Sequence, residues 1–554
     1  MPDSSSDRRL VLLVVAGAAL ILGIIAFGLL RGDTFGSIDS SIKFLQASAL
    51  AASGFRSTAL PYPGLALDPG QMFVPFDPPY VFRAASGYES VFSSGYAILA
   101  APVIHLGPGV LRGLSIFGGA ATAFGTAWLA ERGPRWVPAV LITFATPVWY
   151  YATASGETTL ALAASTLAFV LATREGPVDL PCGLLIGAAG VLRDESLLLI
   201  PGLLYARYRY AKGSSAILPV LLGAAAPVAL LAAVDHLWLH RPVLAHLRHA
   251  VPMLNAVLPR SRALLPELPA LSWPDRYSTI VHYWLLGGGT PLVALAIVLA
   301  LVLAFTLRHR QAGPVVVALV LLGAAIVQWR DIVPLLAAPR FMAGLLYLSP
   351  FLLFALLPAP PGSSEGPARA VALVTSGTFL LITWITLSTA AGKGLGPRLT
   401  IALWPLLVAS AWDGFRAWGR WPGPRPVRAA IVVAGLALIA GSLVMELAVA
   451  LPAWASRVAA DEQALSAIRS DPRQVVVLND DADMALVAAD YFTRPVMFVD
   501  HPRRWRPLAW QLATSGEREF LALSRTPNTP TGMPPFHVED ERLVSRYHLQ
   551  HFVR

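Results

Sequence analysis

The sequence predicts an all-α polytopic membrane bundle of about thirteen transmembrane helices, followed by a small C-terminal α/β domain. Hydrophobic residues make up 55% and charged residues 14% of the 554 positions, whereas soluble domains carry about 25% charged residues. Apolar stretches with almost no charge recur between residues 10 and 451, and each approaches the ~20 residues that cross ~30 Å of hydrocarbon. From residue 452 onward the composition becomes polar. A soluble protein would need far more polar surface, so the soluble class is excluded.

The predicted spans are apolar runs separated by short charged or turn-forming segments. They cover residues 10–30, 109–131, 136–152, 157–173, 180–192, 195–206, 214–234, 282–305, 313–328, 340–357, 369–388, 398–412 and 427–449. Residues 180–206 fit either a broken helix pair or a single tilted span. Residues 91–107 are apolar enough to cross, but Pro102, Gly107 and Pro108 favour a helix that lies along the outer interface.

The basic residues indicate the orientation of the bundle. The first apolar run follows Arg8 and Arg9, exceeds the roughly 7–15 residues of a signal-peptide core and lacks a small-x-small cleavage site. We therefore expect an uncleaved first helix with a cytoplasmic N-terminus, and an odd number of spans puts the C-terminus outside. The net charge of +9 sits mostly in short turns, where the positive-inside rule places it, so a nucleic-acid partner is not expected. The residues of the predicted cytoplasmic turns are Arg132, Arg135, Arg207, Arg209, Lys212, Arg308, Arg310, Arg416, Arg420, Arg425 and Arg428.

Two segments are longer than simple turns. The first outer loop, residues 31–108 within a membrane domain of residues 1–451, is rich in Gly, Pro, Ser and aromatic residues. The second, residues 452–554, is expected to be an extracytoplasmic α/β domain, with strands at 474–478 and 495–499 and helices at 461–470 and 483–490. It carries no Gly-rich phosphate loop, and the single cysteine, Cys182, excludes a disulfide framework.

Acidic residues of the first outer loop are the first candidates for a chemical site. Asp39 precedes an apolar-periodic run, and two interpretations stay open: an N-cap of that helix, or a general base that deprotonates an acceptor hydroxyl. Asp33 lies nearer the end of the first helix. Asp77 lies in a Pro-rich extended stretch and fits a turn equally well. Glu89 lies in the same loop.

Charged residues at the heads of the apolar spans form a second group of candidates. Glu157 and Glu195 either face a cavity or snorkel to water. Arg193, Arg340 and Arg398 lie on the predicted outer side, against the positive-inside trend, where they either bind phosphate through the planar guanidinium or pair with Asp194, Glu157 or Asp331. His282 and Tyr283 follow in another outer loop, where an aromatic anchor is the competing interpretation.

A family resemblance rests on the order of these features along the chain. One helix is followed by a large outer loop with Asp39 near its start, and then by the Tyr- and Ser-rich stretch of residues 88–96. Glu157 heads a later span, a Gly-rich span ends in residues 193–195, and Gly396-Pro397-Arg398 opens a late helix. This order resembles the membrane glycosyltransferases of the GT-C fold that use polyprenyl-phosphate sugars, including protein mannosyltransferases and aminoarabinose transferases. The resemblance covers roughly residues 1–410.

The resemblance implies a catalytic Asp in the first outer loop, for which Asp39 is the matching position and Asp33 the second choice. It implies basic residues that bind the donor phosphate. The residues expected to contact substrate are Asp77, Glu89, Glu157, Arg193, Glu195, His282, Tyr283, Arg340, Lys393 and Arg398. Asp39-Ser40 stands here where the family more commonly has an Asp-Glu pair. The sequence therefore leaves open whether a divalent metal takes part, and it predicts no metal ligand.

We therefore expect a glycosyltransferase of the bacterial cell envelope that moves a sugar from a polyprenyl-phosphate donor to a glycan, lipid or protein acceptor. The reaction is expected at the outer face of the cytoplasmic membrane. Two other classes stay open: a lipid or small-molecule transporter or flippase, whose folds carry internal repeats and midplane charges, and a non-catalytic scaffold. A shared outer cavity lined by Asp39 and arginine would favour the enzyme.

Overall fold

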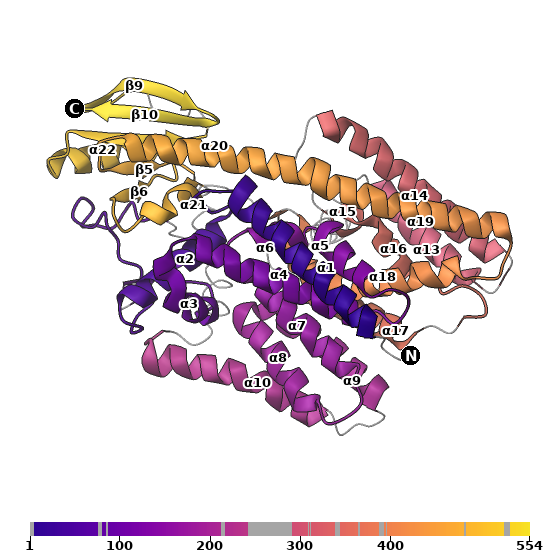
Figure 1. Ribbon diagram of the computed structural model, residues 1–554. Coiled ribbons are helices and arrows are strands. Elements are labelled where there is room, and N and C mark those ends of the chain that lie inside the picture. The colour runs from indigo at the N-terminus through magenta and orange to yellow at the C-terminus, as the bar shows by residue number, and fades with distance from the viewer. Residues whose placement is uncertain are drawn as a thin grey trace.

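The computed structural model describes residues 5–75, 80–84, 87–211, 217–241, 291–308, 310, 312–337, 344–363, 366–386, 393–394, 396–480, 483–525 and 532–554. The chain is mostly helical, with a small β-sheet near its C-terminal end. In Figure 1 the N-terminus lies at one end of the helical bundle, and the C-terminal strands lie at the opposite end.

The first half of the bundle follows the predicted spans in order. Its elements are α1 (Ser5–Gly23), η1 (Ile24–Leu29), α4 (Gly109–Leu129), α5 (Trp136–Phe144), α6 (Val148–Thr153), α7 (Thr158–Ala172), α8 (Asp179–Leu192), η3 (Asp194–Leu199), α9 (Ile200–Ala211), α10 (Ile217–Ala233) and η5 (Val234–Trp238). Glycines allow α8 and α10 to cross closely, because a Cβ atom on Gly183 would lie 2.2 Å from the carbonyl oxygen of Val220. Small residues at such crossings are typical of helix pairs in membranes.

The second half of the bundle contains the longest helices. Its elements are α13 (Pro291–Thr306), α14 (Ala312–Ala337), α15 (Leu345–Leu348), η8 (Pro350–Leu352), α16 (Leu353–Leu356), α17 (Pro367–Thr386), η9 (Arg398–Leu403), α18 (Trp404–Gly419), α19 (Arg425–Val444), η10 (Met445–Ala450) and α20 (Leu451–Ser470). The last three form one continuous helix, the long orange rod of Figure 1. The predicted domain boundary at residue 452 therefore falls inside a helix.

The count of thirteen spans is not confirmed. Within the described residues, five helices are long and apolar enough to cross a membrane: Ser6–Leu29, Ile217–Trp238, Ala312–Ala337, Pro367–Trp384 and Arg425–Ser470. Several predicted spans are divided into shorter helices. Residues 136–152 break into α5 and α6 at Pro147, and the described residues 344–357 of another predicted span form short helices around Pro350. Proline lacks the amide hydrogen that a helix interior requires.

The first outer loop is folded rather than extended. It contains α2 (Ile38–Ala52), the antiparallel pair β1 (Val81–Ala84) and β2 (Gly87–Ser90), α3 (Gly95–Ala100) and η2 (Ala101–Leu106). Residues 91–107, predicted as one interfacial helix, form α3 and η2, and both pack against α2. Neither is long enough to cross a membrane.

The C-terminal part forms a six-stranded mixed sheet. Its strands are β5 (Val476–Leu478), β6 (Val496–Phe498), β7 (Glu519–Ser524), β8 (Gly532–Met533), β9 (Phe536–Val544) and β10 (Tyr547–Val553), in the order β6-β5-β7-β10-β9-β8. The predicted strands at 474–478 and 495–499 are present as β5 and β6, which run parallel. The connecting helical elements are α21 (Met484–Val487), η12 (Ala488–Asp490), η13 (Pro502–Arg504) and α22 (Trp505–Thr514).

The first outer loop and the C-terminal sheet share one hydrophobic core. Ile42 and Leu45 of α2 belong to the same buried cluster as Leu465 of α20 and Leu478 of β5. Main-chain hydrogen bonds reinforce the contact, including one of 2.9 Å from the amide of Phe498 to the carbonyl of Phe73. Segments more than 400 residues apart therefore build one unit at the end of the bundle opposite the N-terminus (Figure 1).

Candidate functional site

The start of α2 brings Asp39 to this end of the bundle. Ser37 caps the helix, because its side chain accepts a hydrogen bond from the amide of Ser40. Asp39 lies in the first turn, where a carboxylate is favoured by the helix dipole. The N-cap interpretation of Asp39 is therefore wrong, since Ser37 fills that position. One carboxylate oxygen of Asp39 is buried, while the residue as a whole is partly exposed.

One turn after Asp39, Lys43 reaches the start of α7. Its ammonium nitrogen lies 2.6 Å from Oε1 of Glu157, and both side chains are more than nine-tenths buried. The same ammonium lies 4.5 Å from the ring centre of Phe92. The Ser40 hydroxyl also approaches Gly156, the residue before Glu157. Since residues four apart share a helix face, α2 presents Asp39 and Lys43 toward the same region.

Arg193 completes a buried ion cluster around Glu157. Its guanidinium donates to Thr158 Oγ1 at 2.7 Å and to Glu195 Oε1 from Nε at 2.8 Å, and lies 3.5 Å from Glu157 Oε1. We call Lys43, Glu157, Thr158, Arg193 and Glu195 the Glu157 cluster. Two cations and two carboxylates balance within it, so Arg193 follows the ion-pair interpretation. Buried ions of this kind need such partners, because their desolvation is costly.

Two buried polar side chains near the cluster were missed by the sequence analysis. Tyr96 of α3 is buried, and burial together with the nearby Glu157 carboxylate raises the pKa of its phenol. Gln46 lies one turn beyond Lys43 and is fully buried. Neither the Tyr96 hydroxyl nor the Gln46 amide has a hydrogen-bond partner within the described part of the chain. Neither residue was singled out from the sequence, because a sequence does not show whether a polar side chain on such a helix is buried.

Glu89 has a different role from the one predicted. Its carboxylate lies 3.2 Å from Arg241 Nε, with both side chains fully buried, and accepts a 2.9 Å hydrogen bond from Thr58. Arg241 also donates to the carbonyl of Ser90 at 2.6 Å. This pair attaches the first outer loop to the end of η5, which holds the segment carrying Phe92 and Tyr96 in place.

Asp33 does not join the Glu157 cluster. It pairs with Arg469 of α20 at 2.8 Å, and Arg469 also binds Asp490. Asp33 is about half exposed, so this pair lies at the surface where the first outer loop meets the C-terminal unit.

Most of the remaining predicted residues lie outside the described part of the chain. Asp77, His282, Tyr283 and Arg340 lie outside the described residues, as do the side chains of Lys393 and Arg398. The backbone of η9, which begins at Arg398, packs against α7 and η3. These are the elements that begin next to Glu157 and Glu195. Within the described ranges, no three His, Cys, Asp or Glu side chains are arranged to hold a metal ion.

Comparison with solved structures identifies distant similarity over most of the chain. ArnT from Cupriavidus metallidurans, bound to undecaprenyl phosphate, is 13% identical with a TM-score of 0.45, over 98% of this chain and 97% of that chain. The oligosaccharyltransferase AglB from Archaeoglobus fulgidus, in complex with an inhibitory peptide and a dolichol-phosphate, is 12% identical with a TM-score of 0.41, over 94% of this chain and 70% of that chain.

ArnT is an aminoarabinose transferase, the kind of enzyme that the sequence resemblance names. No family model matches the chain, and no curated protein matches its sequence. At this identity and these TM-scores, the likenesses assign this chain neither a family nor an activity.

Proposed function

We propose that this protein is a membrane glycosyltransferase that moves a sugar from a polyprenyl-phosphate donor to an acceptor hydroxyl at the outer face of the membrane. One observation carries the proposal: the face of α2 that bears Asp39 and Lys43 lies against the Glu157 cluster. A carboxylate from the first outer loop and a guanidinium from the end of α8 thus lie at the same end of the bundle. Charges held at fixed positions in a buried site are the usual basis of transition-state stabilisation.

In this proposal Asp39 is the general base. The acceptor oxygen forms a bond to the anomeric carbon of the sugar, and its proton passes to the Asp39 carboxylate. The bond between that carbon and the donor phosphate oxygen breaks, and the polyprenyl phosphate leaves with the bonding electrons. The anomeric configuration inverts. A positioned base of this kind contributes roughly 10²–10⁴-fold to the rate.

The Glu157 cluster has a positioning role in this scheme. Lys43 binds Glu157, and Glu157 approaches Arg193, so the register of α2 is fixed relative to α7 and η3. Because Arg193 is already paired with two glutamates, we assign the donor phosphate to other cations. Arg398 is the first choice, since η9 packs against α7 and η3, and Lys393 and Arg340 are further candidates.

The proposal is tested with full-length protein purified in detergent. The probes are undecaprenyl-phosphate monosaccharides, both hexoses and pentoses, presented with a membrane lipid extract as acceptor. Release of undecaprenyl phosphate is measured by mass spectrometry. We expect release with one member of the panel, and a loss of about 100-fold or more in Asp39→Asn.

Asp33→Asn is the matched control, because it changes the other acidic candidate of the same loop. It is expected to keep near-normal release with an unchanged melting temperature. Equal activity of Asp39→Asn and the wild-type protein would remove Asp39 from the mechanism. If no sugar is released but proteoliposomes move the intact lipid across the bilayer, the protein is a flippase and not a transferase.

A further inference from the structure

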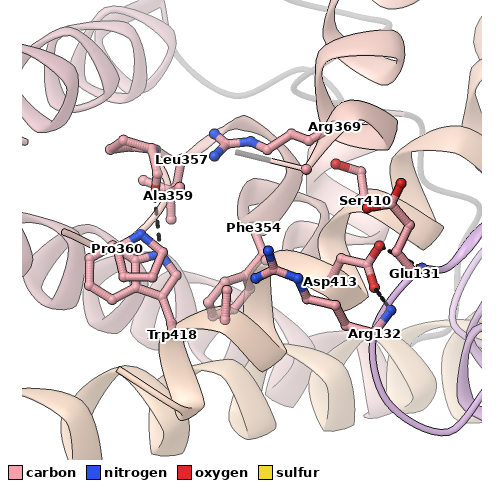
Figure 2. A pocket seen from close by; sticks show the side chains of 14 residues that line it. Glu131, Arg132, Phe354, Leu357, Ala359, Pro360, Arg369, Ser410, Asp413 and Trp418 are labelled. Atoms are coloured by element: carbon pink, nitrogen blue, oxygen red, sulfur yellow. Dashed lines mark hydrogen bonds between the residues drawn. The ribbon is translucent and has the colours of Figure 1, made fainter. Parts of the chain in front are cut away.

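A pocket lies at the opposite end of the bundle from the Glu157 cluster. It is a small, partly open cavity of about 30 Å³ that lies between the turn after α4, the end of α16, the start of α17 and the second half of α18. Figure 2 shows polar groups of Arg132, Arg369, Ser410 and Asp413 around it, with Phe354 and Trp418 on its apolar side. We call it the Asp413 pocket. The turn after α4 is one of the basic turns that indicate the cytoplasmic face.

Both carboxylates that line the pocket already accept hydrogen bonds from the protein. Asp413 accepts from the main-chain amides of Glu131 at 2.9 Å and Arg132 at 2.8 Å, as the dashed lines near it in Figure 2 indicate. Glu131 accepts from the Tyr210 hydroxyl at 2.8 Å. These contacts fix the turn after α4 and give each of the two carboxylates a hydrogen-bond donor within the protein.

Arg369, one of the two cations that line the pocket, is held by main-chain carbonyls. Arg369 is 8% exposed and donates to the carbonyls of Ala355 at 3.2 Å and Leu356 at 3.4 Å, at the end of α16. The guanidinium of Arg132 extends beside Phe354 toward the pocket (Figure 2). Arg416 lies against Gly133 of the same turn. Two guanidinium groups, those of Arg132 and Arg369, therefore lie at the pocket.

Ser410 supplies an independent indication of a ligand. It is 2% exposed and lines the pocket, and its hydroxyl has no hydrogen-bond partner among the described residues. An unpaired buried hydroxyl costs roughly 1–3 kcal/mol. A ligand with an acceptor oxygen would recover this cost. Leu357, Pro358 and Pro360 provide apolar wall next to these polar groups.

We propose that the Asp413 pocket binds a phosphate ester, supplied by the headgroup of an anionic phospholipid in the cytoplasmic leaflet. Arg132 and Arg369 provide guanidinium donors for phosphate oxygens, and Ser410 donates its hydroxyl. Guanidinium suits phosphate because it offers several donors in one plane. Basic pockets between helices at the cytoplasmic side are known to accept such headgroups. Because the cavity is small and partly open, only the phosphate group enters it, and the glycerol and acyl chains stay outside.

The test titrates full-length protein in an uncharged detergent and follows its melting temperature. The probes are dihexanoyl phosphatidylglycerol, dihexanoyl phosphatidylcholine, sn-glycerol 3-phosphate and inorganic phosphate. We expect saturable stabilisation by phosphatidylglycerol at least tenfold tighter than by phosphatidylcholine. Stabilisation by glycerol 3-phosphate at the same concentration would support the phosphate-ester site and overturn the lipid as its source. No saturable stabilisation by any probe would overturn the site.

Substitutions test whether binding depends on this pocket or only on the positive charge at this end of the bundle. Arg132→Gln is expected to weaken phosphatidylglycerol binding about tenfold or more, and Ser410→Ala about threefold to tenfold. Arg420→Gln is the matched control, because Arg420 is exposed at the same end of the bundle and does not line the pocket. Equal weakening by Arg420→Gln would overturn the assignment to the pocket. Arg369→Gln is less suited to the test, since it also removes donors to the end of α16.

Discussion

The two ends of the helical bundle hold their buried charges in different ways. At the Glu157 cluster, side chains from α2, α7 and η3 pair with one another, and the charges balance. At the Asp413 pocket, Asp413 and Arg369 bind main-chain amides and carbonyls, Glu131 binds a tyrosine hydroxyl, and a cavity remains between them. Side-chain pairs therefore balance the charge within the Glu157 cluster, whereas main-chain partners hold charged groups around a cavity at the Asp413 pocket.

This difference has an energetic consequence. Removing one member of a mutually paired cluster leaves a buried charge without its partner, which is costly. Removing a side chain that lacks a partner costs little, and can even stabilise the protein. The two ends should therefore respond differently to equally conservative substitutions.

The largest effect is expected for Glu157→Gln. This change keeps the size of the side chain but leaves Lys43 and Arg193 without the carboxylate between them. We expect a loss of about 3–5 kcal/mol in the free energy of unfolding, measured by thermal and denaturant unfolding in detergent. The double variant Lys43→Met with Glu157→Gln should lose less than the sum of the single changes. An additive result would show that the two side chains are not coupled.

The Asp413 pocket is expected to give a pH-dependent stability. Burial raises the pKa of Asp413 to about 7, so the folded protein binds the proton more tightly than the unfolded chain does. Stability is then greatest below the ordinary carboxyl pKa and falls as the pH rises toward 7, by on the order of 2 kcal/mol between pH 5 and pH 7. Melting temperatures at pH 5 to 8 measure this fall.

Asp413→Asn cannot titrate, so the decline should be smaller in that variant by about 2 kcal/mol. Burial also raises the pKa of Asp483 to about 7, so part of the decline should remain. Arg420→Gln, at the same end of the bundle, should keep the full decline. A wild-type protein whose melting temperature is constant over this range would contradict the assignment to Asp413.

A smaller effect of opposite sign is expected for Ser410→Ala in lipid-free detergent. The substitution removes a buried hydroxyl that has no partner among the described residues. The free energy of unfolding should stay constant or rise by up to about 1 kcal/mol. A clear loss of stability would mean that this hydroxyl is satisfied within the protein, and the two ends of the bundle would then be alike.

The smallest effect is expected for Asp33→Asn, which breaks the surface pair with Arg469. Exposed ion pairs contribute roughly 0–1 kcal/mol, and salt screens them. The melting temperature of the variant should therefore differ little from that of the wild-type protein, and this small difference should shrink as salt is added. A large destabilisation would indicate that this pair holds the first outer loop on the C-terminal unit.

Much of the outer end could be predicted one residue at a time. The positions of Asp39, Glu157, Arg193 and Glu195 at the heads or ends of apolar runs mark them as unusual, because ionised groups are rarely kept at such places. Their partners could not be predicted. Lys43 lies 114 residues from Glu157, and the choice between a phosphate ligand and an ion pair for Arg193 depends on which helices meet.

The sequence by itself determined that this is a helical membrane protein with a polar C-terminal part, because composition and apolar run length act locally along the chain. It also determined the strands β5 and β6, whose short apolar runs are bounded by turn residues. The tertiary structure alone decided that Glu89 pairs with Arg241, and that the first outer loop shares a core with the C-terminal sheet. These are contacts between distant segments, and their energy depends on burial and geometry that no local pattern encodes.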